Sequence, residues 1–255
     1  MQTAILLSVA VVAPVMSSDS NLSWERETQG DCQEVFGGQV CTWSREHGDE
    51  LVEFGATVSL ATVENAPLEG EMVFPPIALA RIALPESVQK QTGVDHLGVN
   101  WEVHGHPPAP FMTPHFDFHF YTIGADAVDA IDCMDLSKPE SLPETYVLRD
   151  ETLPDGTVLV GVCVPAMGMH ALAEPEVAAT TLFEASMVVG YYSRNLVFVE
   201  PMIARDRLMR HEDFTMVLPV IVAPGMGESF PDGFSAHFDE PAGAWRLTFT
   251  MPVVE

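Results

Sequence analysis

Four of the nine histidines of this 255-residue chain lie in one short stretch, HGHPPAPFMTPHFDFHF, residues 104–120. They are His104, His106, His115 and His119. Imidazole is a common ligand of zinc, copper, iron and nickel, so histidines that meet in space can hold a divalent transition metal. A single His-x-His is a weak signal, because a histidine near aromatic residues is more often a hydrogen-bonded core residue. Two such pairs around a short proline-rich loop favour a metal site over a non-metal histidine pocket or a solvated face.

The run PHFDFHFY has the alternation of a β-strand, in which successive side chains point to opposite faces. His115, Asp117 and His119 then share one face, and three phenylalanines share the other. Burying a phenylalanine contributes roughly 1.5–3 kcal/mol, so we expect the phenylalanine face to meet the core. Asp117 is placed to orient an imidazole through the second ring nitrogen.

The preceding segment, residues 96–104, alternates in the same way. If it pairs with the PHFDFHFY strand as its antiparallel neighbour, His106 comes to lie opposite His115, and His104 and His119 form the next pair. Imidazoles from both strands would then reach one ion.

Two other strand ends carry possible ligands. His170 follows VPAMGM, and Glu200 ends LVFVE before a proline. The methionines before His170 would suit copper, although methionine is more commonly core filler. Glu200 is a candidate ligand, a candidate base, or a charge that favours the start of a helix. We therefore predict a zinc or copper site, with Asp117 and Glu200 as candidate catalytic residues. The predicted metal ligands are His104, His106, His115, His119 and His170.

Apolar runs of five to eight residues recur between 20 prolines and 18 glycines, which is typical of a β-rich protein. Helical patterns are few, at residues 76–83, 124–132 and 201–212. The sequence predicts a mainly β fold, an antiparallel sandwich or barrel with a few short helices. We expect a single β-rich domain over residues 51–255, preceded by a polar N-terminal extension over residues 19–50.

The chain is strongly acidic, with 37 Asp and Glu against 11 Lys and Arg and a net charge of −26. This balance excludes nucleic acid as a probable partner, because phosphate-backbone binding needs basic residues. A carboxylate-rich, lysine-poor surface is typical of halophilic proteins, and an ordinary acidic secreted protein is the alternative.

Residues 4–16 form an apolar run that is too short to span a membrane. It suits the core of a signal peptide over residues 1–18, or a buried strand. We therefore expect an exported protein, extracellular or in the cell envelope, with no membrane span.

Export would place the four cysteines in an oxidising compartment, where three pairings are open to them. Cys32 with Cys41 and Cys133 with Cys163 is one of these pairings, and four free thiols are the alternative. The chain has no G-x-S-x-G elbow and no phosphate-binding glycine loop, so nucleophilic serine catalysis and nucleotide binding have little support.

The HGH…PHFDFHFY block, together with VPAMGMH and VFVEPMI, resembles a family of mostly exported bacterial and archaeal proteins of unknown function. The type member of that family is controlled by an extracytoplasmic sigma factor and its anti-sigma factor. The likeness spans roughly residues 55–250. It implies a β-rich fold and assembly into a homo-oligomer, and it implies no established activity. The motif positions carried across are His104, His106, His115, Asp117, His119, His170 and Glu200.

Three functions are compatible with these features. The first is an exported zinc- or copper-binding protein that serves storage, sensing or stress protection. The second is a metal-dependent hydrolase or lyase, in which three histidines hold zinc and leave one position for water. The third is a non-metal structural homo-oligomer whose histidines form hydrogen bonds within a buried interface.

Overall fold

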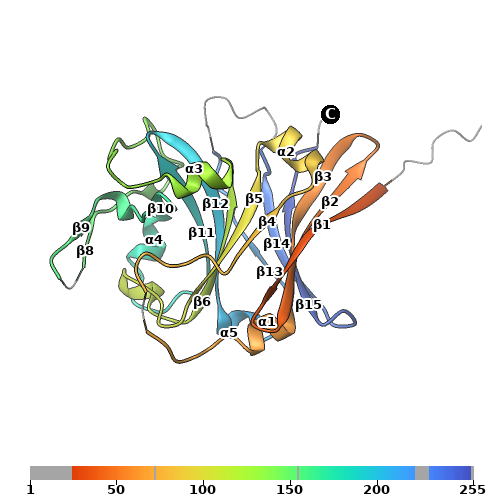
Figure 1. Cartoon of the computed structure of the whole chain (residues 1–255), viewed down its shortest axis with the longest axis horizontal. Coiled ribbons are helices and arrows are strands. Elements are labelled where there is room, and N and C mark those ends of the chain that lie inside the picture. Colours follow the sequence, from red (N-terminus) through yellow and green to blue (C-terminus); the bar gives the residue numbers. More distant parts are fainter. Residues whose placement is uncertain (1–24, 72, 154, 222–229, 254–255) are drawn as a thin grey trace, which may run out of the picture.

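The computed structural model of the chain describes residues 25–71, 73–153, 155–221 and 230–253. The proposed signal peptide, residues 1–18, lies outside the described residues. Two antiparallel sheets pack face to face, and a layer of loops and short elements covers the outer side of one of them (Figure 1). This confirms the predicted β-sandwich, and the sheets are not closed into a barrel.

The first sheet has six strands in the order β1-β2-β3-β15-β14-β13. Its edge hairpin comes from the segment expected to be a polar extension, so residues 25–47 belong to the sandwich. Val40 of this hairpin is buried in the hydrophobic core between the sheets. The strands are β1 Glu25–Val35, β2 Gly38–His47, β3 Glu50–Ser59, β15 Ala244–Thr250, β14 Gly233–Asp239 and β13 Phe214–Met216.

The second sheet has seven strands in the order β4-β5-β6-β12-β11-β10-β7. Its strands are β4 Ala80–Ala83, β5 His96–Glu102, β6 His115–Tyr121, β12 Asn195–Ala204, β11 Ala185–Tyr192, β10 Met169–Ala173 and β7 Tyr146–Val147. A separate small ribbon pairs β8 Glu151–Thr152 with β9 Val158–Leu159.

The helices are short, as predicted. They are α1 Leu60–Glu64, α2 Glu86–Thr92, η1 Ala109–Phe111, α3 Ala125–Asp129, η2 Val160–Val162, α4 Glu174–Val177 and α5 Arg205–Leu208. The prediction for residues 124–132 is confirmed by α3, whereas the helix predicted over 76–83 is wrong because β4 lies there. Only α5 forms within the helix predicted over 201–212, because β12 continues through Pro201. Met202 and Ile203 are buried on opposite faces of that strand, which holds it in the sheet.

The phenylalanines of β6 lie between the two sheets. Phe116, Phe118 and Phe120 are buried there with Phe54 and Phe249 of the first sheet. Phe120 contacts both of these rings, with centroid distances of 6.2 Å to Phe54 and 4.9 Å to Phe249. The alternation predicted for PHFDFHFY is therefore confirmed, and His115, Asp117 and His119 face the other side of the sheet.

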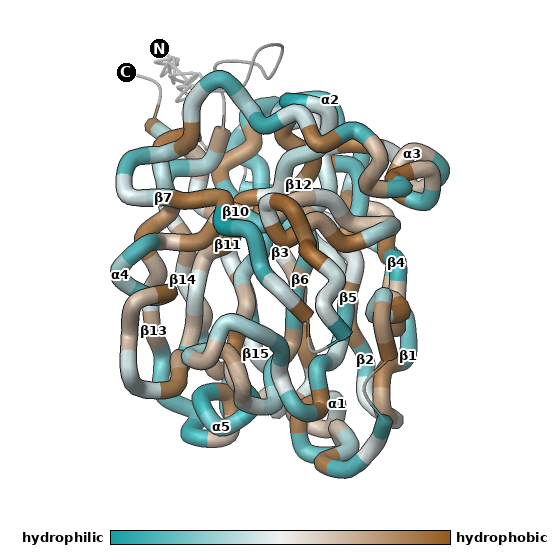
Figure 2. Tube along the Cα trace, turned by 90° about the vertical axis from the view of Figure 1, so that its left-hand side faces the viewer, coloured by the Kyte–Doolittle hydropathy of each residue, from teal (hydrophilic) through white to brown (hydrophobic). Residues whose placement is uncertain are grey.

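That other side is covered rather than open to solvent. A second apolar cluster joins Val188, Phe198 and Met202 of the sheet to side chains of the covering segments, such as Phe111 and Met167. Figure 2 looks onto this covering layer, where hydrophobic and hydrophilic stretches alternate along the trace. The outer face of the second sheet is thus the floor of an enclosed region.

Both cysteine pairs are disulfides. Cys32 and Cys41 lie directly opposite one another on β1 and β2, and Cys133 joins Cys163 within the covering layer. The structure therefore selects one of the three pairings that the sequence left open. Among the described residues, no helix is long and apolar enough to cross a membrane.

Replacing Phe118 by alanine should destabilise the protein by about 3–5 kcal/mol, because it removes a fully buried ring from the interface between the sheets. Urea unfolding followed by fluorescence measures this loss. Val217→Ala is the control, since Val217 is 88% exposed and its truncation should change stability by less than about 0.5 kcal/mol. Equal losses in the two variants would contradict the assignment of the phenylalanine face to the core.

Candidate metal centre

The polar face of β6 meets polar side chains of neighbouring strands at the centre of the second sheet. His115, Asp117 and His119 follow one another along β6, and Glu200 lies on β12, the next strand. The register pairs Val199 with Phe120 and Met202 with Asp117, so Glu200 lies level with His119. These residues are buried.

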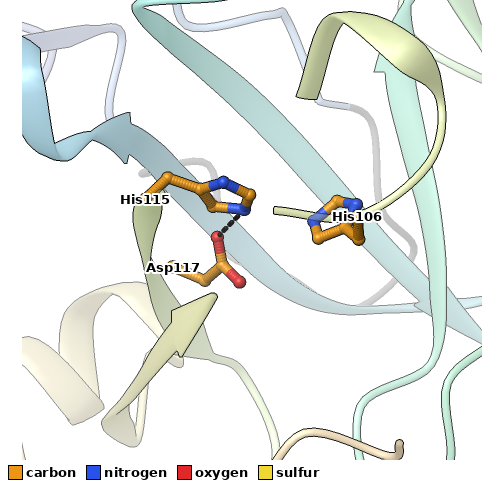
Figure 3. Close-up of side chains that lie close together, drawn as sticks. All are labelled: His106, His115 and Asp117. Carbon is orange, nitrogen blue, oxygen red and sulfur yellow. Dashed lines mark ion pairs between the residues drawn. The ribbon is translucent and has the colours of Figure 1, made fainter. Parts of the chain in front are cut away.

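His106, His115 and Asp117 form the first of two possible ligand groups. Each offers one ligand atom, and these atoms lie within 4.8 Å of one another. The Nε2 atom of His115 is 3.2 Å from Oδ1 of Asp117, and the rings of His106 and His115 have centroids 4.9 Å apart. Figure 3 shows the ring of His106 facing this pair from the loop. We call these three residues the first triad.

His106 reaches the first triad by a different route from the one predicted. We expected it opposite His115 on a paired strand, but β5 ends at Glu102, and Glu102 is the residue paired with His115. The chain turns at Gly105, whose φ is +68° and whose missing Cβ leaves room for the backbone at Phe111. The predicted register is thus wrong, and a loop that folds back over the sheet delivers the imidazole instead.

His119, His170 and Glu200 form the second group, and their ligand atoms also lie within 4.8 Å of one another. Oε2 of Glu200 is 3.5 Å from Nε2 of His119. His170 comes from β10, where it pairs with Gly190 of β11. We call these three residues the second triad. Like the first, it has two imidazoles and one carboxylate.

Three of the four triad histidines have their ring orientation fixed by a backbone carbonyl. Nδ1 donates to the carbonyl of Thr113 in His115 (2.7 Å), of Pro107 in His106 (2.9 Å) and of Val162 in His170 (2.9 Å). A carbonyl only accepts hydrogen bonds, so the proton of each neutral ring is on Nδ1 and the lone pair is on Nε2. Metal-binding histidines in proteins are commonly oriented in this way.

Buried polar atoms without a hydrogen-bond partner concentrate at this face. Among the described residues ten such side-chain atoms occur, and eight of them belong to seven residues that line the outer face of β5, β6 and β12. These seven residues are His96, Asn100, Glu102, His115, Asp117, His119 and Glu200. Unpartnered buried polar groups are rare because each costs about 1–3 kcal/mol, so their concentration on one face makes it the candidate ion-binding site of the described chain.

The spacing of these atoms suits a tetrahedral ion. Two ligands bound at about 2.0–2.1 Å around a tetrahedral zinc are separated by about 3.3–3.4 Å. The His115–Asp117 and His119–Glu200 contacts, at 3.2 Å and 3.5 Å, lie on either side of that value. Neither contact has the geometry of a hydrogen bond, since all four atoms are without a partner.

Burial keeps two of the imidazoles neutral. It lowers the pKa of His106 to about 4 and that of His119 to about 3, despite the nearby negative charge of Asp117. Burial also opposes the charged forms of His115 and Asp117, but these two groups stabilise each other. The pKa of Asp117 therefore falls to about 2, and the pKa of His115 is raised. A cation bound here would stabilise the negative charge of Asp117 in the same way as a protonated His115 does.

Two carboxyl groups of the site have a raised pKa, which favours their protonated forms. Burial raises the pKa of Glu102 to about 8, and the charge of Asp117 acts in the same direction. Burial likewise raises the pKa of Glu200 well above its ordinary value, with further contributions from the charge of Asp117 and a hydrogen bond to it. Ion binding at Glu200 would therefore release a proton.

The structure brings together four of the five predicted histidine ligands. His104 is the exception: it is exposed, and its Nε2 donates to the carbonyl of Gly70 at 2.9 Å. Asp117 and Glu200, which we considered as catalytic residues, are each members of a triad. Glu102 was not singled out, although it follows the same alternation as His96 and could have been found from that pattern.

Glu102→Gln should stabilise the metal-free protein at alkaline pH, by on the order of 2–4 kcal/mol. The native state holds a proton on Glu102 up to about pH 8, whereas an unfolded glutamate loses it near pH 4.5. The contribution of Glu102 to the free energy of unfolding therefore falls as pH rises from 4.5 to 8. A glutamine at this position does not titrate, so the variant has no such loss. Urea unfolding with chelator at pH 5, 7 and 9 measures the difference.

Glu144→Gln is the matched control, because Glu144 is exposed. It removes the same charge from the chain without touching the sheet. A stability difference between Glu102→Gln and wild type that stays constant from pH 5 to pH 9 would show that Glu102 is not held protonated in the native state.

Comparisons of the chain with protein-family models, with curated proteins and with solved structures found no match. The family resemblance of the HGH…PHFDFHFY block therefore stays a prediction. The assignment of a metal centre depends on the chain's own side chains, namely two neighbouring triads of two histidines and one carboxylate.

Proposed function

We propose that this chain is an exported metal-binding protein that holds divalent transition-metal ions, zinc foremost, in the two triads. The observation that carries the proposal is the concentration of buried, unpartnered ligand atoms on one face of the second sheet. A non-metal structural role for the histidines would leave these atoms hydrogen-bonded, so the same observation counts against the structural alternative.

The ligand types favour zinc over copper. Each triad offers two imidazoles and a carboxylate, which is also the ligand set of several catalytic zinc sites. Copper(I) prefers thiolate and thioether sulfur, and all four cysteines are in disulfides. Three ligands also suit iron(II) with open positions, so iron is the competing ion to include in any metal analysis.

Export is supported by the disulfides. Two disulfides in one chain are typical of an oxidising compartment, and they agree with the signal peptide expected over residues 1–18. Self-association remains part of the proposal through the family resemblance alone.

Protein purified without an affinity tag should bind up to two equivalents of zinc, one per triad. His115→Ala and His170→Ala should each lose about one equivalent, because each removes an imidazole from a different triad. Zinc at 100 times its dissociation constant should stabilise the wild type by about 2.7 kcal/mol per site. Elemental analysis, zinc titration calorimetry and chelator-dependent thermal unfolding measure these effects.

His104→Ala is the matched control, since it removes an imidazole of the same sequence block that lies outside both triads. It should bind zinc as the wild type does. Fewer than about 0.2 equivalents of metal in the wild type, or equal losses in His104→Ala and His115→Ala, would overturn the proposal.

A zinc-dependent hydrolase or lyase is the second candidate, because an enclosed cavity adjoins both triads. Glu102, His106, Asp117, His170 and Glu200 all line it. Zinc lowers the pKa of a bound water to about 7, which makes hydroxide available at neutral pH. Glu102 belongs to neither triad and is thus the carboxyl group best placed to act as a general base.

The zinc-loaded protein should then hydrolyse 4-nitrophenyl butyrate faster than the chelated protein does. Glu102→Gln should lower kcat by about 10²–10⁴ without changing the zinc content, as expected for loss of a general base. The test measures the release of nitrophenolate by absorbance and the zinc content of the same sample by elemental analysis. Equal turnover with and without zinc would remove this candidate and leave metal binding in place.

A further inference from the structure

The cavity beside the triads is polar at one end and apolar elsewhere. Its polar end is formed by members of both triads and by Glu102. Its apolar walls include side chains of the sheet and of the covering layer: Val162, Val164, Met167, Leu172, Val188 and Met202. Any molecule in the cavity would therefore touch the metal centre with one end and hydrocarbon with the rest.

The cavity's volume limits what it can hold. At ≈ 100 Å³ it is smaller than the roughly 150 Å³ of an apolar cavity that admits benzene. A ligand with a body of a few carbon atoms fits this space, and a drug-sized molecule or a peptide side chain with its backbone does not.

The polar end offers no basic side chain. No lysine or arginine lines this cavity among the residues that the structure describes, and its ionisable lining groups are carboxyl groups and imidazoles. Any positive charge that an anionic group would meet here has to come from a bound metal ion. Each triad supplies three ligands, so a tetrahedral ion keeps its fourth position for a group that enters from the cavity.

We propose that this cavity binds a small monocarboxylate with a short hydrocarbon tail, whose carboxylate completes the coordination of the metal while the tail lies against the apolar walls. This inference depends on the proposed metal centre. It names the ligand class of that centre and is compatible with either binding or hydrolysis, since such an acid is also the product of ester cleavage.

Other ligand classes fit less well. An ammonium group would compete with the metal for the carboxylates of Asp117 and Glu200. A phosphate carries more charge and more oxygen atoms than a carboxylate does, and it is usually bound by several arginine, lysine or backbone N–H donors. The described lining of this cavity has no arginine or lysine. A neutral hydrocarbon would contact the apolar walls, but the fourth coordination position of the metal would then be occupied by water.

Full-length protein loaded with cobalt(II) provides a direct assay, because the visible spectrum of cobalt changes when its fourth ligand is exchanged. Butyrate should bind about 15-fold more tightly than acetate, since each of its two extra methylenes contributes a factor of about four when buried. Butan-1-ol, with the same tail and no carboxylate, should leave the spectrum unchanged.

Two wall variants test the tail's position. Val188→Phe should fill the cavity and reduce the preference for butyrate over acetate to about one, while cobalt binding is retained. Leu172→Ala should enlarge the cavity and shift the preference from butyrate toward hexanoate, a gain that a merely damaged protein would not show. Val217→Phe, at an exposed position, is the matched control and should behave as the wild type.

The outcomes separate the two proposals. Failure to bind cobalt would overturn the metal centre and this inference together. Normal cobalt binding with equal affinities for acetate and butyrate, with no response to butyrate, or with butyrate binding undiminished in the metal-free protein would overturn the inference alone.

Discussion

Burial of β6 on both of its faces is the constraint on which the rest of the structure depends. All seven residues from His115 to Tyr121 are buried. Three phenylalanines occupy the side that meets the first sheet. Because successive side chains of a strand point to opposite faces, the polar side chains between them lie on the other side. Because the covering layer excludes solvent there, these polar groups depend on one another, on the backbone, or on a bound ion.

The covering layer organises the centre as well as enclosing it. Carbonyls of Pro107, Thr113 and Val162 orient three of the imidazoles, and all three carbonyls belong to the segments that cross the outer face of the sheet. Val162 is followed directly by Cys163, whose disulfide to Cys133 ties this part of the layer together. The ring nitrogens are therefore aimed before any ion arrives, which reduces the reorganisation that binding requires.

The buried carboxyl groups argue against a purely structural role for this face of the sheet. Glu102, Asp117 and Glu200 lie close enough to shift one another's pKa, with no lysine or arginine lining their cavity in the described part of the chain. A sheet built only for stability would place apolar side chains at these positions, since buried charge is costly without compensation. Local conflict of this kind is expected at functional sites, and the proposed divalent cation would resolve it.

By itself, the sequence determined the β class and the division of PHFDFHFY into a phenylalanine face and a histidine face. Both follow from the two-residue period of an extended backbone, which is a local property.

Only the tertiary structure decided how the ligands are grouped. The prediction of one wall of four histidines failed at His104, because β5 ends at Glu102 and the chain turns back at Gly105 to present His106 alone. His170 and Glu200 lie far from β6 in the sequence, so only the order of strands in the sheet could divide the ligands into two triads. Register and loop path depend on packing between distant segments, and no local pattern encodes that packing.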